Sequence, residues 1–335
     1  MITLWLYLIA MLVIILIASQ LFTNALEHFG CQIGISAGVT GSVFAAIATA
    51  LPETSVPIIA LLVGTEDVLV NQEIGVGAIL GAPLMLSTLS TFIMAVSVIK
   101  QRGINGRVRP EKTGFVRDLN FFIFAFFLAA MAMYIPANYF YLRAGLSCIL
   151  ISLYVAYIVL TCLASKALVA EGHGVTPEEP LFLTKIGLKN NTILIFLQIF
   201  IALVLLLLGV KGFISCVESI SKAFAISALL LSLLIIPIAT ELPEKINSIF
   251  WLRNNKDTLG FGNITGAMVF QGTLLPALGI LLTPWQPSKI VETGIFITLI
   301  AAIWLRVNAA KEGLRIKYLM VQGILYVLYI YLVFS

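Results

Sequence analysis

Long apolar stretches that carry almost no charge dominate the sequence. Of the 335 residues, 60% are hydrophobic and 11% are charged, whereas about a quarter of the residues of a soluble protein are charged. A membrane-spanning helix needs about 20 apolar residues. Ten runs meet this requirement: 2–22, 35–63, 72–99, 119–137, 143–164, 191–211, 222–251, 260–284, 289–307 and 314–334. Because segments such as 203–208 lack the alternation of a barrel strand, we expect an all-α integral membrane protein with ten transmembrane helices.

Lysine and arginine are distributed unevenly over the loops between these runs. One alternate set of loops holds fifteen of them: Lys100, Arg102, Arg107, Arg109, Lys112, Arg117, Lys166, Lys185, Lys189, Arg253, Lys256, Arg306, Lys311, Arg315 and Lys317. The opposite set holds four: Arg143, Lys211, Lys222 and Lys289. Cytoplasmic loops carry the excess of basic residues. We therefore expect a multi-pass protein of the cell (inner) membrane with both termini outside the cytoplasm and an even number of spans.

The sequence also contains one segment twice. Residues 47–53 recur at 238–244 with six of seven positions identical, at an offset of 191. The same offset pairs Phe22 with Phe213, so the similarity extends over some thirty residues without a gap. Internal repeats of this kind indicate that a chain is built from duplicated structural units.

The duplication divides the chain into two halves of five expected helices each. They cover 1–165 and 191–335, and a polar linker at 166–190 joins them on the cytoplasmic side. Because five is odd, the second half must enter the membrane from the opposite side. Such inverted repeats are typical of secondary transporters, whose substrate site lies near the membrane midplane between the repeats.

Each repeat places a Leu-Pro-Glu step inside an apolar run, at Glu53 and Glu244. A charged side chain at a helix centre costs about 2.5–3.5 kcal/mol, and proline cannot complete the helical hydrogen-bond ladder. Carbonyl groups near Ala48 and Ala239 should lose their usual partners. Freed carbonyls, a threonine hydroxyl and a carboxylate form a hard-oxygen cluster. Two copies would supply about the six to eight oxygens that Ca²⁺ prefers.

These residues resemble the sodium/calcium exchanger membrane region of the cation/calcium exchanger superfamily. Its repeats each carry a Gly-Thr-Ser-x-Pro-Glu step followed by a Gly-Asn-x-x-Gly-Ser segment. The resemblance covers nearly the whole chain and implies an exchanger-like fold. It implies that Glu53 and Glu244 are the metal-binding carboxylates, with Thr49 and Thr240 as flanking ligands. Gln271 lies near the acidic or amide position of the family.

Several positions depart from the family pattern. The serine after the threonine is Ala50 in the first repeat and Glu241 in the second, and the later Gly-Ser pairs have lost their hydroxyls. Glu241 has two interpretations. Three carboxylates in a low dielectric cannot all stay ionised, which favours proton coupling, as does Gln271. Alternatively, Lys245 lies four residues after Glu241, the spacing of a helical ion pair, and would neutralise it.

The sequence therefore predicts a secondary-active cation antiporter that exchanges Ca²⁺ for Na⁺ or H⁺ by alternating access. The alternative is a transporter of the same fold for another cation or solute, with altered or lost sodium coupling. We expect no cofactor besides the transported ions, and the lipid bilayer as the surroundings of the chain. The sequence does not specify an oligomeric state.

Two other classes of protein are not expected. An enzyme would need a nucleophile or metal motif, but the two histidines, His28 and His173, form none, and there is no HExxH or GxSxG segment. Asp118 falls at the end of an expected span rather than within it. The basic segment 100–117 is explained by membrane topology, so we expect no nucleic-acid binding, and contact with anionic lipid is a modest further possibility.

Overall fold

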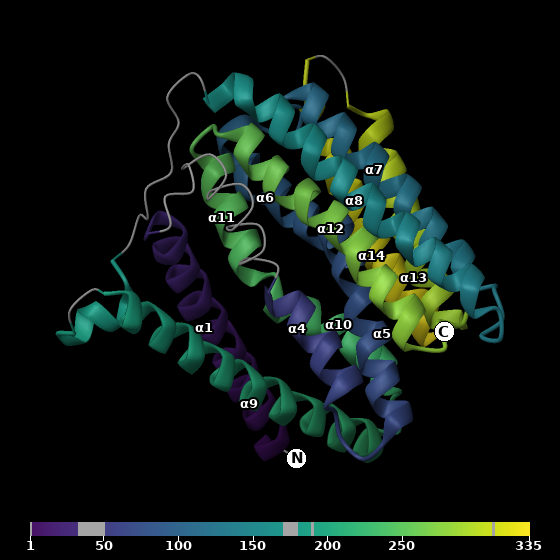
Figure 1. The fold of residues 1–335 in the computed structure, drawn as a ribbon. Helices are drawn as coiled ribbons and strands as arrows, with labels where there is room; N and C mark the ends of the chain where they lie inside the picture. Colours follow the sequence, from purple (N-terminus) through teal and green to yellow (C-terminus); the bar gives the residue numbers. More distant parts are fainter. Residues whose placement is uncertain (1, 33–50, 170–179, 189–190, 310–311) are drawn as a thin grey trace. The chain divides into compact units, whose positions relative to one another are not determined.

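The computed structural model describes the whole chain except residues 1, 33–50, 170–179, 189–190 and 310–311 (Figure 1). The described residues form helices and two very short strands. They divide into two compact units, one of Met1–Asn71 with Ile158–Ile226 and the other of Gln72–Tyr157 with Ser227–Ser335. Each unit therefore draws on both halves of the sequence.

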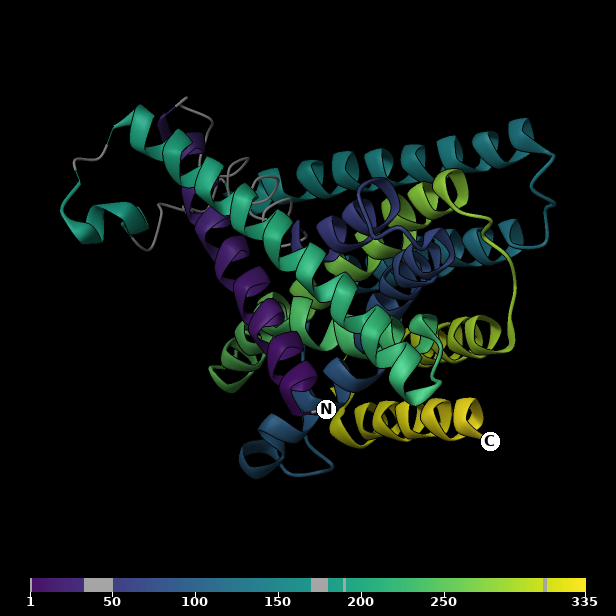
Figure 2. The same ribbon diagram turned by 90° about the horizontal axis from the view of Figure 1, so that it is seen from below.

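The first unit is built around two long antiparallel helices, α1 (Ile2–Gln32) and α9 (Thr192–Phe224) (Figure 2). Glycines bring them together, because a Cβ at Gly209 would lie 3.0 Å from Ile15 and one at Gly212 would overlap Met11. The unit also contains α4 (Leu51–Leu62), the end of α8 (Phe140–Val169) and the 3₁₀ turn η3 (Phe182–Ile186). Helix α4 packs against both long helices.

A buried amide pair fixes part of the expected linker to this unit. The Gln198 side-chain amide donates to Asn24 Oδ1 at 3.0 Å, and Asn24 donates to the Pro180 carbonyl at 3.3 Å. The backbone N–H groups of Phe182 and Leu183 donate to Asn24 and Gln198, both at 3.0 Å. Residues 180–183 are thus held by three hydrogen bonds to these two membrane-helix amides.

The second unit contains the remaining elements. They are α5 (Val68–Met85) from Gln72 onward, the π-helix η2 (Leu86–Ser90), α6 (Thr91–Arg102), β1 (Arg107–Val108), α7 (Lys112–Ala132), the first part of α8, α10 (Ala228–Thr240), α11 (Leu242–Arg253), α12 (Asp257–Leu282), α13 (Lys289–Val307), β2 (Leu314–Arg315) and α14 (Ile316–Phe334). Helix α12 packs on α7 and α11, and α14 packs on α6 and α13.

Within the described parts of the chain, eight helices are long and apolar enough to cross a membrane, which makes the chain a multi-pass membrane protein. Two shorter apolar helices, Glu53–Leu62 and Ala228–Ile238, fall in the two expected spans that contain the Leu-Pro-Glu steps. The expected helical fold is therefore confirmed. One departure from it is an antiparallel ladder of two residues per strand, which pairs Arg107 with Arg315 and Val108 with Leu314.

Two expected helix boundaries are wrong for a common physical reason. The expected span 191–211 continues to Phe224 in α9, because Lys222 pairs with Glu218 at 2.6 Å and lets the helix carry charges near its end. Helix α7 starts at Lys112 rather than 119, because the Glu111 carboxylate accepts the backbone N–H groups of Thr113 and Gly114. In both cases paired or capped charges extend a helix beyond its uncharged stretch.

Candidate cation-binding site

The second Leu-Pro-Glu step interrupts a helix, as the sequence predicts. Helix α10 ends at Thr240 and α11 begins at Leu242, and Glu241 stands between them with φ −90° and ψ 4°. Pro243 has no N–H to donate to the Ala239 carbonyl, so the helical ladder lacks that bond. The neighbouring bonds from the Glu241 N–H to Pro237 and from the Lys245 N–H to Glu241 remain, at 3.3 and 3.1 Å. Irregular backbone at membrane depth is tolerated only within protein or beside water.

Glu241 and Lys245 form a buried ion pair at this break. Lys245 Nζ lies 3.3 Å from Glu241 Oε2 and donates to the Pro237 carbonyl at 3.1 Å. The Glu241 side chain has no exposed surface and that of Lys245 is 11% exposed. Of the two interpretations of Glu241 that the sequence left open, the ion pair is the arrangement present in the structure.

Thr240 lies beside this pair and is also buried. Its hydroxyl donates to the Ile236 carbonyl at 3.0 Å. Because a hydroxyl oxygen also has two acceptor lone pairs, Thr240 keeps the capacity to contact a cation.

Helix α5 approaches the break closely through two of its glycines, Gly77 and Gly81. A Cβ at Gly81 would overlap the Leu233 carbonyl oxygen and lie 2.7 Å from Pro237 Cγ. Pro237 has no N–H, so the Leu233 carbonyl lacks its usual helical partner. One turn earlier, a Cβ at Gly77 would overlap the Ser232 hydroxyl. The two glycines therefore allow direct backbone contact between α5 and α10.

Gln271 lies on α12 of the same unit and is buried. Its side-chain oxygen has no hydrogen-bond partner among the described residues. A buried amide oxygen without a partner costs about 1–3 kcal/mol. Such an oxygen is chemically suited to a cation ligand.

The first Leu-Pro-Glu step belongs to the other unit. Glu53 lies on α4, two residues after Leu51, which is the first described residue of that helix. Its side chain is 3% exposed. Thr49 lies outside the described residues. Glu244 lies in the first turn of α11, and its side chain is not among those described. Both glutamates thus follow the repeated Leu-Pro step on a helix.

The π-helix η2 is a feature that the sequence reasoning missed. It begins at Leu86 and packs against α12, α13 and α14. Buried hydroxyl groups line it: Ser87, Thr88, Ser90 and Thr91. Ser87 donates to the Pro83 carbonyl at 2.8 Å and Thr91 donates to the Leu86 carbonyl at 2.9 Å. The run of serine and threonine four to eight residues after Pro83 was the available signal, and π-helices often occur at functional sites.

Asp118 was expected at the end of a span, and the structure corrects this. It is buried within α7 and accepts a hydrogen bond from Thr265 Oγ1 of α12 at 2.7 Å. Arg117 lies 3.4 Å from its other oxygen. The Thr265 hydroxyl therefore joins α12 to α7. Among the described residues, no three His, Cys, Asp or Glu side chains gather as a metal site.

Sequence comparison identifies relatives over most of the chain. The profile of the family described as "Sodium/calcium exchanger protein" matches residues 3–163 and 194–335. A curated relative, inner membrane protein YrbG of Escherichia coli (strain K12), is 32% identical over 91 residues. That alignment covers 27% of this chain and only 28% of YrbG.

Solved structures of similar fold cover nearly the whole chain. The H⁺/Ca²⁺ exchanger CAX aligns with a TM-score of 0.73 and 16% identity over 98% of this chain and 82% of its own. YfkE aligns with a TM-score of 0.71 and 14% identity over 100% and 92%. The sodium-calcium exchanger NCX_Mj aligns with a TM-score of 0.58 and 18% identity over 99% and 98%. At these identities the likeness establishes the fold.

Proposed function

Because the chain belongs to the sodium/calcium exchanger protein family, we propose that it is a secondary-active antiporter that exchanges Ca²⁺ for Na⁺ or H⁺. Family membership and the exchanger fold support cation transport coupled to Ca²⁺. Exchangers named for each counter-ion are among the structures of similar fold, one for H⁺ and one for Na⁺. The identity of the counter-ion is therefore left to experiment.

The transported cation is bound, in this proposal, by Glu53 and Glu244. The observation that carries it is their equivalent placement, since each directly follows the repeated Leu-Pro step on a helix, α4 for Glu53 and α11 for Glu244. Glu53 is also buried, and ionisable side chains inside membrane spans typically mark ion pathways. Thr49, Thr240, Glu241 and Gln271 are proposed to contribute further oxygens.

The proposed membrane arrangement follows from the repeat. Two inverted repeats, 1–165 and 191–335, each contribute five transmembrane helices, and residues 166–190 join them on the cytoplasmic side. Both termini then lie outside the cytoplasm, in accord with the basic loops. Alternating access would move one group of helices against the four that carry the repeated motifs, exposing the bound cation to one side of the membrane at a time.

Calcium flux into vesicles tests the proposal. The purified chain is reconstituted, and radioactive Ca²⁺ uptake is measured under an imposed sodium gradient and, separately, an imposed proton gradient. The gradient that drives uptake identifies the counter-ion. Glu53→Gln and Glu244→Gln should each abolish uptake, because a neutral amide cannot compensate the charge of a divalent ion.

Glu312→Gln serves as the matched control, because the Glu312 side chain is 74% exposed in a loop. It should retain wild-type uptake. Full activity in both site variants would refute the assignment of the two glutamates. A wild-type protein that moves no divalent cation under either gradient would favour the alternative, a transporter of this fold for another solute.

A further inference from the structure

Lys245 brings a positive charge into the second helix break. Its ammonium nitrogen lies 3.3 Å from the Glu241 carboxylate and 3.1 Å from the Pro237 carbonyl oxygen. A carboxylate and a main-chain carbonyl are the kinds of oxygen that a hard cation takes as ligands, and the Pro237 carbonyl also accepts the backbone N–H of Glu241 at 3.3 Å. The ammonium therefore contacts the type of oxygen pair that could otherwise hold an ion.

Stability alone does not account for this pair. A surface pair at this helical spacing contributes only about 0.2–0.5 kcal/mol. Burying both charges costs desolvation free energy, and apolar residues of similar size are often as stable or more stable. Glu241 is completely buried and Lys245 is 9% exposed. A role in ion binding explains why two charges are present where two apolar side chains would fit.

We propose that the Lys245 ammonium is a tethered monovalent cation that occupies a cation position at this break in place of Na⁺. The inference rests on the proposed function and specifies its coupling. With Glu241 paired to Lys245, the two glutamates of the proposed function, Glu53 and Glu244, contribute two negative charges. That charge matches one divalent cation. The cation position beside Glu241 then takes up no Na⁺ during the transport cycle, because the Lys245 ammonium already occupies it.

Thermal unfolding of the full-length purified protein tests this inference without measuring transport. The quantity measured is the melting temperature in NaCl minus that in choline chloride at equal ionic strength. Lys245→Met keeps the side-chain length and removes the charge, so free Na⁺ should replace the ammonium beside Glu241. The difference should then exceed that of the wild type by about 2 °C or more, because ligand binding to the folded state raises its stability.

The double variant Glu241→Gln, Lys245→Met is the control, since it removes the carboxylate that would hold the added sodium. Its difference in melting temperature between NaCl and choline chloride should return to the wild-type value. Equal salt differences in wild type and Lys245→Met would overturn the inference and leave the pair a structural one. If Lys245→Met is recovered only when purified in NaCl, that result supports the inference. Loss of both Lys245→Met and Lys245→Gln in either salt overturns it.

The outcome is separable from that of the flux experiment. A wild-type protein without calcium flux would refute the antiporter proposal, whereas the sodium response of Lys245→Met reports on the pair alone. If the flux proposal holds and the sodium response is absent, only the tethered-cation inference fails.

Discussion

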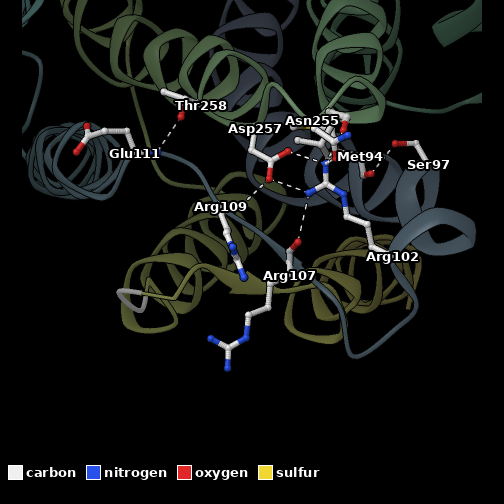
Figure 3. A network of polar contacts seen from close by, with 10 residues as sticks. Met94, Ser97, Arg102, Arg107, Arg109, Glu111, Asn255, Asp257 and Thr258 are labelled. Atoms are coloured by element: carbon white, nitrogen blue, oxygen red, sulfur yellow. Dashed lines mark hydrogen bonds and ion pairs between the residues drawn. The ribbon is translucent and has the colours of Figure 1, made fainter.

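Asp257 accepts hydrogen bonds from both terminal nitrogens of Arg102, at 2.7 and 2.8 Å (Figure 3). The same Arg102 side chain donates to the Leu252 carbonyl at 2.7 Å, and the backbone N–H of Arg109 donates to Asp257 at 2.6 Å. The pair thus joins the end of α6, the start of α12 and the loop between α6 and α7. Both side chains are largely buried, at 14% and 9% exposure.

Arg102→Ala should therefore destabilise the second unit strongly. Removing one partner of a buried pair leaves an uncompensated charge and costs about 3–5 kcal/mol. Arg102→Lys should recover only part of this loss, because lysine cannot make the two-pronged contact. The melting temperature of the purified protein measures both effects.

Arg107→Ala provides the control, because Arg107 pairs with the exposed Glu312. Exposed pairs contribute about 0–1 kcal/mol, so this variant should melt close to the wild type. Equal losses in Arg102→Ala and Arg107→Ala would show that the buried pair has no special structural role.

A second prediction concerns the contact of α5 with α10. Gly81→Ala should place a methyl group on the Leu233 carbonyl and against Pro237. Overpacking of this kind costs about 1–3 kcal/mol, and the contact lies one turn before the Glu241 break. We therefore expect lower thermal stability and reduced calcium uptake. Small residues at membrane helix interfaces permit such close backbone approach.

The repeat offers a matched control for this change. Gly262 corresponds to Gly77 in the duplicated pattern, and a Cβ there meets no described atom within 4 Å. Gly262→Ala should leave the melting temperature unchanged or raise it, because alanine favours helix by about 1 kcal/mol. A Gly81→Ala protein as stable as Gly262→Ala would contradict the packing argument.

The Glu111 cap should make the start of α7 sensitive to acid. Burial raises the pKa of this carboxyl, but the backbone N–H groups of Gly114 and Thr113 outweigh it and hold the pKa below its ordinary value of 4.5. A carboxyl whose pKa is lowered on folding stabilises the protein above its unfolded pKa and loses that contribution as the pH falls through the folded value.

Glu111→Ala should therefore lose about 0.5–1 kcal/mol at neutral pH, a small value because the side chain is exposed. The difference in melting temperature from wild type should be constant above about pH 5 and shrink below the ordinary carboxyl pKa. A difference that persists unchanged at pH 3 would show that the carboxylate charge is not what stabilises the helix start.

The sequence predicted the features that depend on local chemistry. Long uncharged stretches predicted the apolar helices, and the missing N–H of Pro243 predicted the break at Glu241. These follow from the chain itself, because a proline or a run of apolar residues acts the same way in any membrane helix.

Features that depend on side-chain orientation and packing were not predicted. Asp118 is buried because Thr265, 147 positions away, donates to it. Spacing alone allowed Lys245 either to pair with Glu241 or to leave it free, and only the packed helices determine the rotamer. The π-helix at Leu86 likewise depends on hydroxyl groups that bond back to carbonyls near Pro83.

The last prediction separates binding from folding at Gln271. Its side-chain oxygen is buried without a hydrogen-bond partner among the described residues. Gln271→Leu has nearly the same volume and removes this oxygen. Because an unsatisfied buried polar group costs about 1–3 kcal/mol, the variant should melt at a higher temperature than wild type in the absence of divalent cations.

The same change should weaken the response to calcium. If Gln271 ligates the ion, Ca²⁺ should raise the melting temperature of Gln271→Leu less than that of the wild type, and higher Ca²⁺ should be needed for half-maximal uptake. Thr298→Val is the control, because the Thr298 hydroxyl is buried and donates to the Gly294 carbonyl of its own helix at 2.7 Å. It should change the calcium response little. A Gln271→Leu protein with wild-type calcium stabilisation would show that this amide is a packing residue, because a ligand cannot be removed without loss of binding free energy.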